Sequence, residues 1–201
     1  MEKNRKDFKE TGTTSRRAQN MSSQHSNVPA PEEYSEAVLS VRRVAKVIKG
    51  GRRFAFSALV VVGNKRGSFG VALGKSRDVS SAIAKALRKA RKTMMEVPLY
   101  KTTVPHAVLG KHGASTVLIR SAGKGTGVIA GGAARSVMEA LGVRDVFAKV
   151  IGNSNPQNVV KATINALQQL RSAQHIAKIR GKSVKDIIGA QDMSGASDVQ
   201  N

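Results

Sequence analysis

One stretch, residues 37 to 73, constrains the fold of this chain more than any other. Between Arg53 and Val62, alternate side chains fall on opposite faces of an extended chain, and both faces are largely apolar. This pattern is typical of a central strand that is covered on both sides. We therefore expect three short strands joined by turns at residues 49–53 and 63–67.

The first of these strands changes phase near its middle. The apolar alternation that begins at Ala37 stops after Val41 and resumes as a continuous run from Val44 to Ile48. The interruption falls on Arg42 and Arg43, and we interpret it as a bulge or bend.

The turn that follows this strand combines glycine with positive charge. Gly50 and Gly51 allow positive φ and let the backbone lie close to a partner. Lys49, Arg52 and Arg53 flank the two glycines. This combination suits the phosphate backbone of a nucleic acid.

The positive charge of the chain is large and unevenly distributed. A formal net charge of +21 and a pI near 11.1 indicate a polyanionic partner, either nucleic acid or an acidic membrane surface. Residues 1–36 hold six basic and six acidic side chains, whereas residues 42–92 hold fifteen basic side chains and one acid, Asp78. The excess therefore lies on predicted strands and a helix.

Several kinds of site lack the residues that they need. The chain has no cysteine, and its four histidines lack the spacing of zinc ligands. No apolar run approaches the roughly 20 residues of a membrane span. Residues 100–175 contain only Glu139 and Asp145 as acids, so no catalytic constellation can be assembled. We expect no enzymatic activity, no cofactor, no metal and no membrane partner.

Composition and periodicity divide the chain into four predicted segments. Residues 1–36 are polar, mixed in charge and proline-bearing, so we expect a disordered leader. Residues 37–98 form a first domain, and residues 99–175 form a C-terminal α/β domain. Residues 176–201 form a basic extension and tail, with a short helix capped by Ser183.

A basic, amphipathic helix is predicted to close the first domain. Asp78 or Ser80 can cap it, and it runs to about Glu96 with an apolar stripe at 3.6-residue spacing. The third strand carries Gly70, Ala72 and Gly74 on one face, and these small residues would let the helix approach closely.

The C-terminal domain is predicted to place two helices on a mixed sheet. Its expected elements are a hairpin at 107–120, a helix at 132–141, a strand at 145–151, and a helix that begins at Pro156 behind its capping residue Asn155.

Two glycine motifs resemble nucleotide-binding loops; we reject the first and disfavour the second. A P-loop ending at Gly74-Lys75-Ser76 would need glycine where the chain has Phe69. The segment Gly125–Ala130 matches a loose dinucleotide fingerprint, but its acidic partner, Asp145, begins a strand, whereas the ribose-binding acid should end one. Two interpretations of Gly131 and Gly132 stay open: phosphate binding at a helix start beside Lys124, or close helix packing.

Several motifs in unbroken order resemble a known family. The runs are Arg43–Arg52, Phe56–Gly63, Gly125–Gly132, Gly152–Val160 and Arg180–Val184. Together they resemble the bacterial-type small-subunit ribosomal protein five over about residues 37 to 188.

The resemblance implies an α+β fold of two small α/β sandwiches. The first would be a three-stranded sheet plus helix like a double-stranded-RNA-binding domain, and the second a mixed sheet with two helices. It also implies a cytoplasmic protein of the small ribosomal subunit that binds small-subunit ribosomal RNA and influences assembly and translational accuracy. Neighbouring small-subunit proteins four and eight are the implied protein partners, with messenger RNA nearby. The first hairpin would lie next to the spectinomycin site.

These considerations give a set of candidate site residues. The predicted RNA-binding residues are Arg42, Arg43, Lys46, Lys49, Gly50, Gly51, Arg52 and Arg53 in the first hairpin, Lys65, Arg66 and Lys75 after the next two strands, Lys85, Arg88, Lys89 and Lys92 in the helix, and Lys124, Gly131 and Gly132 in the second domain. The resemblance adds Gly110 and Thr116 as protein contacts, although Thr116 stands where many members carry a basic residue.

Two other functions remain possible from the sequence. A free-standing, regulatory double-stranded-RNA-binding protein would share the basic surface. A small nucleotide-dependent enzyme would explain the glycine loop. Readout by base stacking is disfavoured because the chain has only five Phe and two Tyr.

Overall fold

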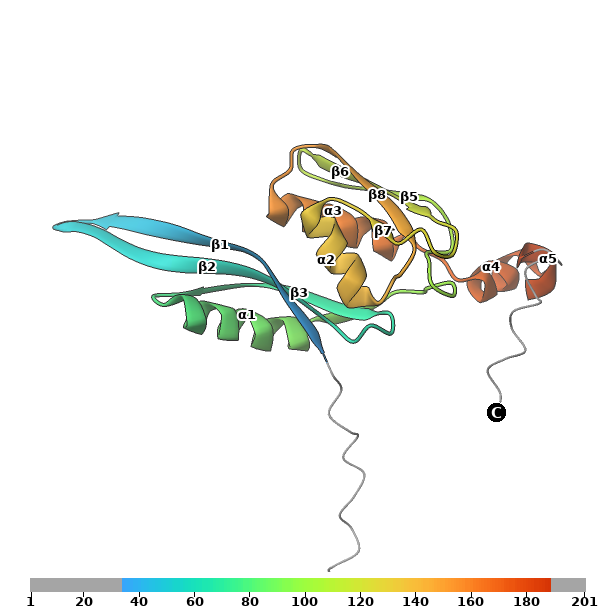
Figure 1. Ribbon diagram of the computed structural model, residues 1–201, viewed down its shortest axis with the longest axis horizontal. Coiled ribbons are helices and arrows are strands. Elements are labelled where there is room, and N and C mark those ends of the chain that lie inside the picture. The colour runs from blue at the N-terminus through green and yellow to red at the C-terminus, as the bar shows by residue number, and fades with distance from the viewer. Residues whose placement is uncertain (1–33, 189–201) are drawn as a thin grey trace, which may run out of the picture. The chain divides into compact units, whose positions relative to one another are not determined.

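The computed structural model describes residues 34–188 (Figure 1). The predicted disorder of the leader therefore falls outside the described residues, except for Tyr34, Ser35 and Glu36. Strand β1 (Ser35–Ile48) already includes two of these three. The polar tail that we expected after Ile188 also lies outside the described residues.

The first sheet has the order β1-β2-β3-β4 and is antiparallel throughout. Its other strands are β2 (Gly51–Gly63), β3 (Ser68–Ser76) and the short β4 (Met94–Glu96). The predicted central strand is confirmed, since β2 lies between β1 and β3. The sheet has one strand more than the three that we expected.

Helix α1 (Val79–Lys92) covers one face of this sheet. It ends four residues before the predicted Glu96, because Met94–Glu96 pairs with β3 as β4. The small residues of β3 have the expected effect: a Cβ built on Gly70 or Gly74 would lie 2.2 Å from a carbonyl oxygen of α1. The helix backbone therefore rests directly on the strand.

The second sheet has the order β5-β6-β8-β7. Its strands are β5 (Val108–His112), β6 (Ser115–Ser121), β7 (Val128–Ile129) and β8 (Val146–Gly152), and only β7 runs parallel to its neighbour, β8. Helices α2 (Gly132–Leu141) and α3 (Pro156–Gln168) pack on one face. The α+β class with a mixed second sheet is confirmed; the two-residue β7 was not predicted.

Both faces of β2 are apolar because each contacts a different layer. Ala58, Val60 and Val62 pack against the alanines of α1. Leu59 and Val61 point the other way and share one core with α2 and α3. The two sheets thus meet through a common hydrophobic layer, and the domain boundaries that we drew stay a prediction.

The turn between β2 and β3 is fixed against the end of α2. The amide of Lys65 donates to the carbonyl of Ala140 at 3.1 Å, and the amide of Gly67 donates to that of Leu141 at 2.9 Å. Lys65 itself has a φ of 57°. The basic side chains of this turn, Lys65 and Arg66, are exposed.

Two short helices follow the second sheet. Helix α4 (Ala173–Arg180) was not predicted, and Ser172 caps it by accepting a hydrogen bond from the amide of His175. Helix α5 (Val184–Ile188) has the predicted cap, since Ser183 Oγ accepts from the amide of Asp186 at 3.3 Å. Within residues 34–188, no helix is long and apolar enough to cross a membrane.

Candidate nucleic-acid interface

The first hairpin extends beyond the rest of its sheet (Figure 1). Strand β3 pairs with β2 only as far as Phe56, opposite Ser76. From Val44, which is opposite Ala55, the two strands continue without a third neighbour. We call residues 44–55 the ribbon. All its side chains up to Phe54 are exposed except that of Ile48, which is half-buried.

The predicted bulge at Arg42 and Arg43 is wrong. The register shifts between Val38 and Ser40, and the ladder then runs unbroken to the pair Ile48–Gly51. The side chains of β1 from Val41 to Val47 are all exposed, so packing imposes no strict alternation of apolar and polar residues on them. The change of phase in the sequence therefore marks the end of the covered sheet.

The tip of the ribbon has the backbone that its glycines suggested. Gly50 has a φ of 91° and Gly51 a φ of 137°, both unfavourable for other residues. A Cβ at either position would meet nothing within 4 Å. The tip is thus free to lie against a partner.

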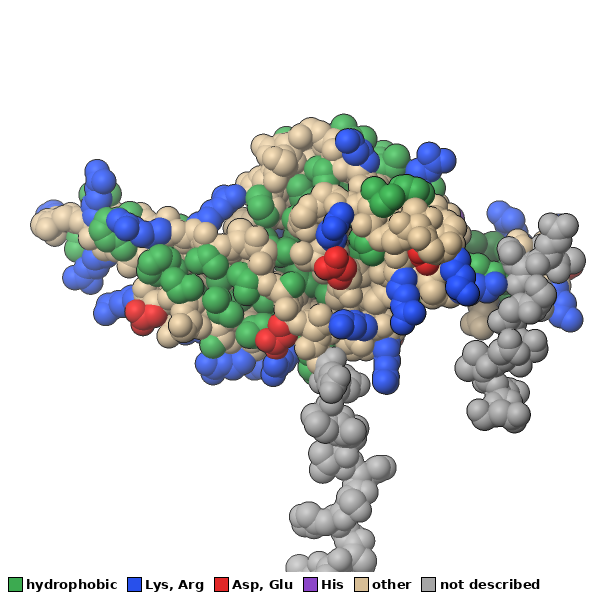
Figure 2. All heavy atoms as spheres, in the orientation of Figure 1, with side chains coloured by type: hydrophobic (Ala, Val, Ile, Leu, Met, Phe, Trp, Pro, Cys, Tyr) green, Lys and Arg blue, Asp and Glu red, His purple; other side chains and the backbone are tan. Residues whose placement is uncertain are grey.

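Positive charge concentrates on the ribbon without compensation (Figure 2). Lys46 lies directly opposite Arg53, an arrangement of like charges that destabilises an isolated pair of strands. No acidic residue occurs between residues 37 and 77. At its base, an Arg42 Nη donates to Asn155 Oδ1 at 3.5 Å, and the Arg43 guanidinium stacks 3.9 Å above the centre of the Phe54 ring.

A second cationic surface covers the outer side of α1. Its members line a shallow depression of about 540 Å³: Lys85, Arg88, Lys89, Arg91 and Lys92. Arg91 pairs with Glu36 at the start of β1, and Lys85 Nζ donates to Ser76 Oγ at 3.4 Å. Lys75 is exposed at the neighbouring end of β3.

The glycine-rich loop before α2 is held by an acid of the protein itself. Asp145 Oδ1 accepts hydrogen bonds from the amides of Gly125 and Gly127 at 2.9 and 3.1 Å, and its Oδ2 accepts from the hydroxyl of Thr102 at 2.8 Å. The carboxylate is buried. Because these amides already bind a carboxylate, they are not available to the phosphates of a dinucleotide.

These hydrogen bonds predict a pH-dependent contribution to stability. The amide of Gly127, then the Thr102 hydroxyl, hold the pKa of Asp145 below its ordinary value of 3.8. A group with a depressed pKa stabilises the fold above its unfolded pKa and loses that contribution as pH falls through the folded pKa. We expect Asp145→Asn, which keeps the shape but not the charge, to melt several degrees earlier at neutral pH. Below pH 3.8 the difference in melting temperature between the variant and wild type should shrink. Thermal melts across a pH series measure this difference, and a difference that stays constant would contradict the prediction.

Gly131 and Gly132 begin α2 in ordinary backbone geometry. Gly131 is the N-cap with a φ of −67°, and a Cβ on Gly132 would meet nothing within 4 Å. The close-packing interpretation therefore has no support in the surroundings of Gly132. Contact with an RNA phosphate stays a prediction for both glycines and for the exposed Lys124 beside them.

The two residues predicted to contact proteins lie on different sides of the second sheet. Gly110 faces α3, where its Cβ would lie 2.1 Å from the carbonyl oxygen of Ala162. Thr116 lies on the outer face, opposite Ile151. The outer face also carries exposed apolar side chains that we did not predict: Leu109, Ile129, Phe147 and Ile151. The signal was present, because large apolar residues also stand at outward positions of these strands, between polar and charged ones.

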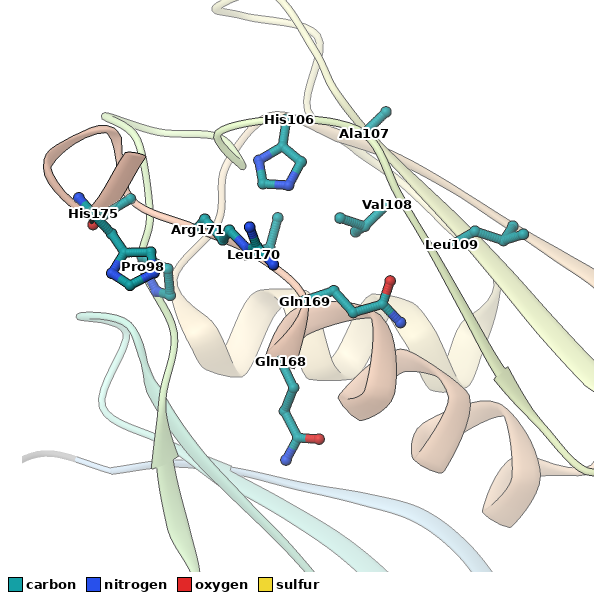
Figure 3. A pocket seen from close by; sticks show the side chains of 11 residues that line it. Pro98, His106, Ala107, Val108, Leu109, Gln168, Gln169, Leu170, Arg171 and His175 are labelled. Atoms are coloured by element: carbon teal, nitrogen blue, oxygen red, sulfur yellow. Dashed lines mark hydrogen bonds between the residues drawn. The ribbon is translucent and has the colours of Figure 1, made fainter. Parts of the chain in front are cut away.

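A pocket of about 980 Å³ opens beside the start of β5 (Figure 3). His106 approaches it from the loop before β5, Arg171 from the α3–α4 link and His175 from α4. No carboxylate lines it. Among residues 34–188, no group of three His, Asp or Glu could hold a metal ion. Its lining thus includes neither a carboxylate nor a described group of three metal ligands.

Two sheet-and-helix sandwiches with extended cationic surfaces are features of a nucleic-acid-binding protein. The comparisons with known proteins specify which one. Two family models match: "Ribosomal protein S5, N-terminal domain" at residues 34–98 and "Ribosomal protein S5, C-terminal domain" at residues 110–180. The chain belongs to the ribosomal protein S5 family.

Curated relatives agree with the family models. A protein of Lawsonia intracellularis named small ribosomal subunit protein uS5 is 56% identical over 149 residues, which is 74% of this chain and 91% of the relative. Proteins of the same name from Syntrophobacter fumaroxidans and Buchnera aphidicola are 52% and 51% identical over 152 residues, 76% of this chain, and are covered to 92% and 93%.

Proposed function

We propose that this protein is a structural constituent of the small ribosomal subunit in the cytoplasm. It binds small-subunit ribosomal RNA, contributes to assembly and to translational accuracy, and has no enzymatic activity. The observation that supports RNA binding best is the ribbon, where Lys46, Arg53 and their neighbours lie in a stretch without one acid. A polyanion relieves their mutual repulsion.

The basic side of α1 extends the same kind of surface. Double-stranded RNA is recognised mainly through phosphates and 2′-hydroxyls, which cationic side chains on a rigid scaffold can contact without base stacking. The predicted loop residues Lys124, Gly131 and Gly132 would add a third contact. Messenger RNA passing nearby would meet the same positive charge.

Neighbouring small-subunit proteins four and eight are the proposed protein partners. The outer face of the second sheet supports a protein contact, because Leu109, Phe147 and Ile151 are each between 43% and 53% exposed there. Thr116 lies among them and is the better placed of the two predicted contact residues.

A sedimentation experiment separates this proposal from its main alternative. On a sucrose gradient of a cell lysate, the full chain should co-sediment with the small subunit. A free-standing regulatory RNA-binding protein would stay near the top of the gradient, and that result would overturn the ribosomal role.

The ribbon makes a quantitative prediction for RNA binding. Each phosphate contact releases condensed counterions, so Arg52→Ala or Arg53→Ala should each reduce the slope of log affinity against log salt by about one unit or somewhat less. The measurement is filter binding to small-subunit ribosomal RNA across a salt series. Lys161→Ala, an exposed cation on α3, serves as the control. Equal salt slopes for wild type, the two ribbon variants and the control would mean that the ribbon does not contact phosphates, and α1 would become the better candidate.

A further inference from the structure

The cationic surface of α1 has an acid of the protein itself at one end. Glu36, the second residue of β1, forms an ion pair with the guanidinium of Arg91. The same guanidinium lies 5.8 Å from the centre of the Tyr34 ring. The chain that precedes the first sheet therefore joins the described structure directly beside this surface.

Charge is divided unevenly within the stretch that leads to Tyr34. All six Lys and Arg of residues 1–36 lie before residue 18, whereas Glu32, Glu33 and Glu36 lie at its end. Residues 18–33 thus contain two acids and no Lys or Arg, and we call them the acidic segment. Although residues 1–36 sum to zero, the part that adjoins α1 is negative.

Helix α1 has no acid of its own to balance its cations. Residues 79–92 contain none, and five Lys and Arg side chains line the depression on its outer side (Figure 2). Arg88 lies three residues before Arg91 and four before Lys92, so its side chain neighbours both on the helix surface. Like charges at this spacing destabilise a helix. Carboxylates close to this surface would relieve the repulsion.

The acidic segment can reach the whole depression. A fully extended chain spans at most about 3.6 Å per residue, so Glu33 and Glu32 can extend to roughly 11 and 14 Å from Glu36. Along the helix, Lys85 and Arg91 are separated by a rise of about 9 Å. Both carboxylates can therefore lie over the depression while Glu36 keeps its pair with Arg91.

We propose that in the free protein the acidic segment lies across the cationic surface of α1 and occupies it until RNA displaces it. This inference rests on the proposed RNA binding and adds an intramolecular competitor for the phosphates. The contact needs no fixed fold of the segment, because carboxylates attract a group of cations in many arrangements.

The covalent connection to β1 favours this occupant over the same segment of a second molecule. A short flexible tether gives an effective concentration on the order of millimolar. A second copy of the chain competes only at its own concentration in solution. The observed pair of Glu36 with Arg91 holds the tether at the edge of the surface and shortens the distance that the segment must span.

The first test observes the contact directly in the full chain. The chain has no cysteine, so Ser23→Cys provides a single site for a nitroxide spin label within the acidic segment. At low salt and without RNA, we expect the label to broaden the amide NMR signals of α1 around Lys85 and Arg88. Adding Glu32→Gln and Glu33→Gln should largely remove this broadening.

Glu2→Gln with Glu10→Gln is the matched control, because it makes the same change of charge outside the acidic segment. This control should keep the broadening. Equal broadening with and without the carboxylates of Glu32 and Glu33 would mean that they do not hold the segment on α1, and the inference would be wrong. Broadening that is just as strong between spin-labelled and isotope-labelled molecules in a mixture would assign the contact to a second copy, which also overturns it.

The second test measures the competition with RNA. The variant with both Glu32→Gln and Glu33→Gln should bind small-subunit ribosomal RNA about threefold to tenfold more tightly at low salt, because the surface of α1 is no longer occupied. The gain should disappear as salt is raised, since screening weakens the contact. The Glu2→Gln, Glu10→Gln control should bind within about twofold of wild type.

The two tests together distinguish the possible failures. Tighter binding of RNA by the Glu32→Gln, Glu33→Gln variant without carboxylate-dependent broadening would mean that the acids only repel RNA, and the inference would fail. Carboxylate-dependent broadening in a protein that shows no salt-dependent RNA binding would support the intramolecular contact and refute the proposed function instead.

Discussion

Alanine at Gly63 is expected to remove a large part of the stability of this protein. An ideal Cβ on Gly63 would lie 2.0 Å from the carbonyl oxygen of Ala140 and 2.9 Å from its Cβ. Both obstacles belong to a helix whose end is fixed by hydrogen bonds to Lys65 and Gly67, so α2 cannot move aside locally. We expect a loss of about 3 kcal/mol or more, a large share of the roughly 5–15 kcal/mol of a typical domain.

Gly132→Ala is the matched control for this substitution. It adds the same methyl group at the first residue of α2, where nothing lies within 4 Å, whereas the methyl group on Gly63 of β2 would meet the last turn of that helix. We expect the free energy of unfolding to change by less than about 1 kcal/mol, with a slight gain, because alanine favours helix. Urea denaturation of both variants measures the difference. Similar midpoints would mean that the two layers are not held as closely as the structure indicates.

Local signals explain why much of the second half was predictable. The boundaries of α2 agree with the prediction because glycines begin it and Gly142, with a φ of 91°, ends it. Helix α3 begins at Pro156, and Asn155 Oδ1 accepts from the amide of Gln157 at 3.3 Å, as an N-cap should. In these two helices the signals for the start, the end and the buried stripe all indicate the same segment, which is why the prediction was correct.

Elements that depend on tertiary contacts were not predictable in the same way. Met94 has the spacing to continue the stripe of α1, yet Met94–Glu96 becomes β4 because β3 offers an unpaired edge. Helix α4 buries only Ala177, so it lacks the apolar stripe that would have revealed it. The shift of register at Val38 leaves no mark in the sequence that differs from ordinary alternation.

The candidate site also has a part that could be predicted from local sequence and a part that depends on tertiary contacts. Cationic surfaces on the ribbon and α1 follow from sequence, because charged side chains there stay exposed wherever the elements lie. The hydrogen bonds of Asp145 to the glycine loop depend on a contact across about twenty residues, which spacing alone cannot establish. The residues that contact RNA are identified by measuring the RNA binding of variants, and the tip of the ribbon is the first place to substitute.

Aspartate at Gly51 should give the largest loss of RNA binding among single substitutions in the ribbon. It places a negative charge at the tip, between the cations of both strands, where the backbone has open space on every side. At a few ångströms from a phosphate, this charge should weaken binding to small-subunit ribosomal RNA by about 10- to 100-fold at low salt. From the family resemblance, we also expect an altered response to spectinomycin in cells.

Gly51→Asn separates this charge from the strain of the backbone. Both side chains have nearly the same shape and both must adopt a φ of 137°, so the two variants share the conformational cost. In the free protein, aspartate should be the more stable of the two, because it offsets repulsion among Lys49, Arg52 and Arg53. In RNA binding the order should reverse. Thermal melts and filter binding of the same two proteins measure both quantities, and an aspartate variant that binds RNA as well as the asparagine variant would place the tip away from the phosphates.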